Sequence, residues 1–162
     1  MRFETSAVVA TTPATAFALT QDYAKRLTWD PFLRSAELLG GAGAPQVGVR
    51  AWCVSRAGLG METEYVSFSP PKVAAVRMTR GPWVLAEFAG TWEFRGPAEG
   101  PTTITFRYHL RTRPGWLSWL MEPVAARWFA RETKGRVAAL SQKLQDSDPE
   151  GGPGSLTVSA LD

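Results

Sequence analysis

The sequence predicts an α+β fold in which a curved antiparallel sheet wraps around one long C-terminal helix. Three observations predict it. Strand-like runs, separated by turns rich in Gly and Pro, fill residues 33–112. Two of these runs, 83–95 and 102–112, alternate apolar and polar side chains. The segment 116–145 instead carries apolar residues at helical spacing, so it is expected to form a helix that packs on the apolar face of the sheet.

The region before the main run of strands is expected to hold one strand and two short helices. Residues 2–10 have strand character. Thr12 is placed to cap a helix over 13–20, which has proline at its first position. A second short helix, capped by Asp22, is expected to end at Leu27. Six further strands are then expected, at 33–39, 47–55, 61–69, 72–79, 83–95 and 102–112.

One face of this sheet is predicted to be apolar and the other wet. The apolar face of 102–112 carries Ile104, Phe106, Tyr108 and Leu110. The apolar face of 83–95 carries Val84, Ala86, Phe88, Gly90, Trp92 and Phe94. His109 falls on the opposite face with Arg107 and Arg111. It is therefore interpreted as a surface residue rather than a general base.

The C-terminal segment divides into a helix and a tail. Pro123 is expected to bend or restart the helix, and Glu132 is placed to pair with Arg136 one turn later. Residues 146–162 are rich in Gly, Pro, Ser and Asp and are expected to be disordered. The helix is expected to pack through a stripe made of Phe129, Thr133, Val137, Leu140 and Leu144.

Composition excludes several kinds of site. A chain of 162 residues fits one domain. The single cysteine, Cys53, excludes an internal disulfide and any zinc site built on two or more thiolates, and the single histidine excludes a His-rich metal site. No metal and no cofactor are expected. No apolar stretch is long enough to cross a membrane, and the N-terminal residues lack the layout of a signal peptide, so a cytoplasmic location is expected.

The formal net charge of +3 is unevenly distributed. Residues 146–162 contain acids but no Lys or Arg, so the remainder of the chain is more basic than the total suggests. A basic body attracts nucleic acid, anionic lipid or an acidic ligand. The cations are scattered rather than clustered, which favours a solvated surface. A nucleic-acid partner is therefore not expected, and a protein- or RNA-interaction module is only a further alternative. The sequence specifies no oligomeric state.

The order of several short segments resembles the START-like superfamily, also called the SRPBCC or polyketide cyclase/dehydrase and lipid transport group. The resemblance covers about residues 2–145 and implies a helix-grip fold, with residues 1–145 as the ligand-binding domain. The segments that carry it are Thr12-Pro13 with Phe17, Asp22 with Trp29-Asp30-Pro31, Val47-Gly48-Val49-Arg50, Gly90-Thr91-Trp92-Glu93-Phe94 and Arg136-Val137-Ala138-Ala139-Leu140.

The resemblance implies that function lies in a cavity between the sheet and the C-terminal helix. Binding of a hydrophobic small molecule (a lipid, a quinone or a polyketide-like compound) is the first interpretation, without catalysis. The alternative is a polyketide cyclase, aromatase or dehydratase that uses Tyr65, Ser67 or Tyr108 as a proton donor or base. Ser67 matches the family's polar position, but Ser69 stands where the family leads us to expect arginine.

Aromatic residues are the best candidates to line such a cavity. The seven tryptophans exceed what a small core requires, although rings could also simply fill the interior. Trp116 and Leu120, with flanking arginines, could instead contact a membrane surface transiently. The predicted ligand-binding residues are Trp29, Phe32, Tyr65, Ser67, Met78, Trp83, Phe88, Trp92, Phe106, Tyr108, Trp116, Leu120, Val124 and Trp128.

Overall fold

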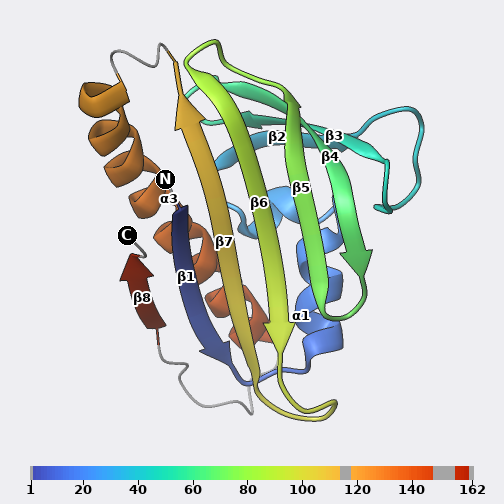
Figure 1. Ribbon diagram of the computed structural model, residues 1–162. Coiled ribbons are helices and arrows are strands. Elements are labelled where there is room, and N and C mark those ends of the chain that lie inside the picture. Colours follow the sequence, from blue (N-terminus) through green and yellow to red (C-terminus); the bar gives the residue numbers. More distant parts are fainter. Residues whose placement is uncertain (1, 114–117, 148–155, 161–162) are drawn as a thin grey trace.

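The computed structural model describes residues 2–113, 118–147 and 156–160. In the last helix it describes the side chains of only some residues, and in the last strand it describes the backbone alone. Figure 1 shows a curved sheet with the long helix against one face. The elements in chain order are β1 (Arg2–Val9), α1 (Pro13–Gln21), α2 (Arg26–Trp29), β2 (Leu33–Leu38), β3 (Arg50–Ser55), β4 (Gly60–Ser69), β5 (Val73–Arg80), β6 (Leu85–Arg95), β7 (Thr102–Thr112), α3 (Ser118–Ser147) and β8 (Leu156–Ala160).

The strands form one antiparallel sheet in the order β2-β3-β4-β5-β6-β7-β1-β8. Strands from β2 to β7 follow as a meander, and β1 returns to pair with β7. The curvature leaves a concave side, which α3 and the two short helices cover (Figure 1). The predicted helix-grip architecture is confirmed.

The first helix begins as the sequence predicts, and the second does not. Thr12 Oγ1 accepts a hydrogen bond from the Thr15 amide at 3.2 Å, with proline at the first helical position. Asp22 instead caps a turn, because its Oδ1 accepts from the amides of Ala24 and Lys25. The second helix starts four residues later, at Arg26.

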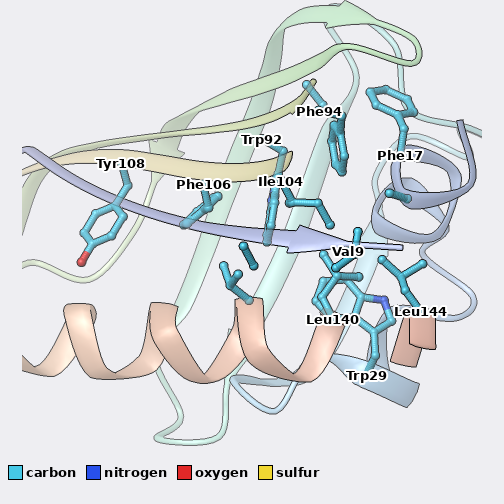
Figure 2. Close-up of a cluster of buried hydrophobic side chains, with 14 of the residues drawn as sticks. Val9, Phe17, Trp29, Trp92, Phe94, Ile104, Phe106, Tyr108, Leu140 and Leu144 are labelled. Atoms are coloured by element: carbon cyan, nitrogen blue, oxygen red, sulfur yellow. The ribbon is translucent and has the colours of Figure 1, made fainter. Parts of the chain in front are cut away.

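The alternation in β7 divides the two faces as expected. Its apolar residues are buried in one cluster with Val9, Phe17, Leu140 and Leu144. Figure 2 shows Ile104, Phe106 and Tyr108 of β7 among the side chains of this cluster. On the outer face, Arg107 pairs with Glu4 and Glu93. The helix stripe is confirmed for its described side chains, which are Thr133, Val137, Leu140 and Leu144.

Two β-bulges change which residues face inward. On β4 the pairing with β5 shifts between Tyr65 and Ser67, so Val66 has no direct partner. Phe68 then takes the inward position, 5.7 Å from the Tyr65 ring centroid. Ser67 lies opposite Ala75 on the outer face, which corrects the expectation that it shares a face with Tyr65. On β6 a second shift turns Leu85 inward in place of Ala86.

The C-terminal region differs from prediction in two ways. The helix α3 runs through Pro123 without restarting. Residues 156–160, predicted to lie in a disordered tail, form β8 and pair antiparallel with β1 at the edge of the sheet.

Candidate functional site

A cavity of about 110 Å³ lies on the concave side of the sheet. Six consecutive strands, β2 to β7, contribute residues to its wall, and α2 and α3 each add one arginine. Most of its wall is apolar. The residues that line it are Gln21, Tyr23, Arg26, Phe32, Leu33, Cys53, Ser55, Leu59, Met61, Thr63, Tyr65, Ala74, Val76, Pro82, Leu85, Phe88, Gly90, Trp92, Phe106, Trp128 and Arg136.

Aromatic rings form one side of the cavity. Trp92 and Phe106 lie 4.4 Å apart between ring centroids, and Phe32 contacts Trp128 at 5.7 Å. Gly90 also lines the cavity, next to the rings of Phe88 and Phe106. Rings arranged in this way offer flat apolar surface to a ligand.

A hydrogen-bonded group of two tyrosines and a glutamine also lines the cavity. Tyr65 donates its hydroxyl hydrogen to Gln21 Oε1 at 2.9 Å. The hydroxyls of Tyr23 and Tyr65 lie 3.1 Å apart. Tyr23 is the donor in this hydrogen bond, because Tyr65 has a single hydroxyl hydrogen and gives it to Gln21. Gln21 in turn donates to Thr20 Oγ1 at 3.1 Å. Burial raises the pKa of both tyrosines, so both hydroxyls stay protonated at neutral pH.

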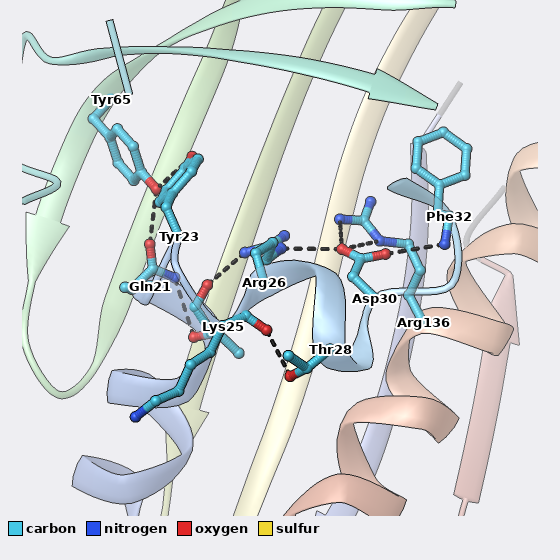
Figure 3. Close-up of polar contacts among 10 residues, drawn as sticks. Gln21, Tyr23, Lys25, Arg26, Thr28, Asp30, Phe32, Tyr65 and Arg136 are labelled. Atoms are coloured by element: carbon cyan, nitrogen blue, oxygen red, sulfur yellow. Dashed lines mark hydrogen bonds and ion pairs between the residues drawn. The ribbon is translucent and has the colours of Figure 1, made fainter. Parts of the chain in front are cut away.

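Two arginines and one aspartate form the charged part of the site (Figure 3). Asp30 Oδ2 accepts from Arg26 Nε at 3.0 Å, and from Arg136 Nε and Nη2 at 3.2 and 2.7 Å. Its Oδ1 accepts from the Phe32 amide at 3.2 Å. Arg26 also donates to the Thr20 carbonyl. This Arg26–Asp30–Arg136 triad joins α2 to α3 beneath the sheet.

The aspartate of the triad is ionised. Burial alone would raise the pKa of Asp30, but the adjacent guanidiniums of Arg136 and Arg26 overcome that effect and hold its pKa below the ordinary value. The side chain of Asp30 is fully buried, whereas those of Arg26 and Arg136 are 9% and 12% exposed. Burial also raises the pKa of the Cys53 thiol, so it stays protonated at neutral pH.

The structure brings six of the predicted residues together around the cavity. They are Phe32, Tyr65, Phe88, Trp92, Phe106 and Trp128. Trp116 and the side chain of Leu120 lie outside the described residues.

The other predicted residues do not line the cavity. Trp29 belongs to the core and packs edge-on against Trp92 at 6.3 Å. Tyr108 is buried against Phe3, and burial raises its pKa to about 12. Ser67 lies on the outer face. Met78, on β5, is not among the residues that line the cavity. Trp83 and Val124 are among the exposed large apolar residues.

Sequence reasoning missed the polar half of the site, and one of its pairings is wrong. Arg136 pairs with Asp30, not with Glu132 as the helical spacing suggested. Asp30 and Arg26 are four residues apart on a short helix, which is a local signal that could have been recognised. Arg136 is far away in sequence, and nothing local marks it. The other missed lining residues with polar atoms are Gln21, Tyr23, Cys53, Ser55 and Thr63.

Neither a metal cluster nor a membrane-spanning helix is found in the described parts of the chain. Residues 2–113, 118–147 and 156–160 hold no group of three His, Cys, Asp or Glu side chains that could bind a metal ion. None of the helices within those ranges is both long enough and apolar enough to cross a bilayer.

A curved antiparallel sheet that encloses an apolar cavity with its C-terminal helix defines a helix-grip, ligand-binding fold. Residues 1–145 match the family described as polyketide cyclase / dehydrase and lipid transport, and the chain belongs to that family. A search of curated protein sequences gives no significant match.

Solved structures share the fold at low sequence identity. The Zhui aromatase/cyclase from Streptomyces sp. R1128 aligns with a TM-score of 0.74 and 14% identity, over 94% of this chain and 99% of its own. StfQ, a di-domain ARO/CYC from the steffimycin biosynthetic pathway, aligns with a TM-score of 0.73 and 15% identity, over 91% of this chain and 51% of its own. A START superfamily protein from Mycobacterium smegmatis aligns with a TM-score of 0.63 and 13% identity, over 86% of this chain and 98% of its own.

Proposed function

We propose that this protein binds a hydrophobic small molecule in the cavity between the sheet and α3. The observation that carries the proposal is the cavity wall itself, in which Phe32, Phe88, Trp92, Phe106 and Trp128 surround an unfilled volume. Polar groups at one side give such a pocket orientation and specificity. The ligand class is a lipid, a quinone or a polyketide-like compound.

Filling the cavity tests the proposal. Cys53→Phe adds a ring at a lining position on β3, and Cys53→Ala removes the thiol while leaving the space open. We expect the neutral probe 2-naphthamide to bind the wild type and Cys53→Ala, and to lose its affinity for a folded Cys53→Phe protein. Titration of the intrinsic tryptophan fluorescence measures the affinities. Equal affinity in all three proteins would contradict binding in this cavity.

A second candidate function is ring closure or dehydration of a polyketide-like substrate. Tyr65 supports it, because it is the one residue among the three predicted catalytic candidates that lines the cavity. Its hydroxyl is protonated, which suits a proton donor but not a base. Its hydrogen is held by Gln21, so donation to a substrate would require that bond to break.

Turnover separates the two functions. If Tyr65→Phe abolishes conversion of a polyketone while binding of 2-naphthamide persists, the protein is an enzyme. If no polyketone is converted and the wild type carries a lipid or quinone in native mass spectrometry, the binding function is supported.

The distribution of surface charge favours a small-molecule ligand over nucleic acid. Arginines on the outer face of the sheet, such as Arg77 and Arg111, pair with glutamates on neighbouring strands. Paired charges leave little positive field for phosphates. A transient contact with a membrane surface and a cytoplasmic location stay predictions.

A further inference from the structure

The cavity has more positive than negative charge around it. Arg26 and Arg136 both line it, and each pairs with Asp30. Within the described part of the chain, neither arginine has a second carboxylate partner. Two guanidiniums and one carboxylate leave one positive charge in excess. An uncompensated charge in a water-poor site raises the free energy of the folded protein, so it favours a ligand that brings the missing anion.

Each guanidinium also has one Nη that makes no hydrogen bond to a described residue. Arg26 uses its Nε and Nη1, and Arg136 uses its Nε and Nη2. The remaining Nη of each side chain makes no hydrogen bond within residues 2–113, 118–147 and 156–160. Arginine presents its N–H groups as a planar fork that matches the oxygens of a carboxylate.

Aromatic rings hold both guanidiniums beside the apolar part of the cavity. The Arg26 guanidinium carbon lies 4.8 Å from the Trp29 ring centroid and 6.0 Å from that of Trp92. That of Arg136 lies 5.1 Å from Phe32 and 5.5 Å from Phe106. Three of these four rings, those of Phe32, Trp92 and Phe106, line the cavity. A ligand ring packed on them would place its substituent within reach of the arginines.

We infer that the ligand of this cavity is an apolar ring compound with one anionic, carboxylate-type oxygen group, and that Arg26 and Arg136 bind this group. The inference rests on the proposed binding function and names its ligand class. A purely structural triad, which only fastens α2 to α3, would not prefer an anionic ligand to a neutral one. Charge preference is therefore the property that separates the two roles.

A matched pair of probes measures this preference. The compounds 2-naphthoate and 2-naphthamide share one fused ring, but only the first is charged at neutral pH. We expect the wild type to bind 2-naphthoate about tenfold or more tightly than 2-naphthamide, the size typical of a hydrogen bond to a charged group. Isothermal titration calorimetry gives both dissociation constants.

Variants assign the preference to the triad. Arg136→Met is expected to bring the affinity ratio of the two probes near one. Arg136→Lys keeps the charge but lacks the planar fork, and it is expected to give a reduced ratio. If Arg136→Met does not fold, this conservative variant carries the test. Arg50→Met removes the same charge from the outer face, where Arg50 pairs with Glu62, and is expected to keep the wild-type ratio.

The outcomes are distinct. If the wild type binds both probes equally, or if the ratio survives in both Arg136 variants, the anionic-ligand inference is overturned while the proposed binding function stands. If the wild type binds neither probe, the proposed function is overturned for ring compounds, and the inference with it.

Discussion

Among the described residues, five arginines on the outer face of the sheet pair with five glutamates, whereas beneath the sheet two arginines share one aspartate. Several outer pairs are well exposed; the Arg111 and Glu87 side chains are 61% and 52% exposed. The inner triad is shielded from water. Exposed ion pairs contribute little to the stability of a protein. A shielded, unmatched cluster at a cavity is where charge can select a ligand.

The largest expected effect comes from removing the shared aspartate. Asp30→Asn leaves the guanidiniums of Arg26 and Arg136 together without a counterion, so we expect the free energy of unfolding to fall by about 3–5 kcal/mol. Urea denaturation monitored by tryptophan fluorescence measures it. A loss below about 1 kcal/mol would show that the inner cluster behaves like an exposed pair.

Acid should remove the same stabilisation. The pKa of Asp30 is lowered in the folded protein, so its contribution is fully present above the unfolded-state pKa, near 3.9, and is lost as the pH falls through the lower folded value. We expect the stability difference between the wild type and Asp30→Asn to be constant from about pH 5 to 8 and to shrink below about pH 4. A difference that shrinks at higher pH would mean that the folded pKa is raised.

The two tyrosines of the cavity wall should differ in their effects. Tyr65→Phe leaves Gln21 Oε1 and the Tyr23 hydroxyl without their partner, so we expect a loss of about 1–3 kcal/mol. Tyr23→Phe leaves the bond from Tyr65 to Gln21 intact, and we expect a loss of about 0.5–1.5 kcal/mol. Chemical denaturation of both variants gives the comparison. A larger loss for Tyr23→Phe would contradict the central place given to Tyr65 in this group.

The smallest effect is expected on the outer face. Arg77→Met breaks an exposed pair with Glu64, and we expect the free energy of unfolding to change by less than about 1 kcal/mol. The stability difference between the wild type and Arg77→Met should be smaller at high salt than at low salt, because salt screens exposed charges. A change as large as that of Asp30→Asn would remove the contrast between the two faces.

The fold was largely predictable because it depends on local patterns. The period-two alternation of β7 places Phe106 inward and Arg107 outward, and the turn residues separate the strands at the right spacing. The bulge after Tyr65 was not predictable, since a single unpaired residue leaves the sequence pattern unchanged. That bulge turns Ser67 away and Phe68 inward, so a parity argument fails there.

The candidate site was predictable only in its apolar half. Trp92 and Phe106 were found because large rings on an inward face are visible in the sequence. The triad was missed because its third member, Arg136, meets Asp30 through a contact between residues 106 positions apart. The helical spacing predicts Glu132 as the partner of Arg136, but the packing of α3 against α2 places Arg136 beside Asp30 instead.

The most direct test of the account is a crystal structure of the protein with 2-naphthoate. We predict that the fused ring lies against Trp92 and Phe106 and that the carboxylate accepts hydrogen bonds from the guanidiniums of Arg26 and Arg136. A naphthoate bound outside the cavity, or inside it with the carboxylate turned away from both arginines, would contradict the account.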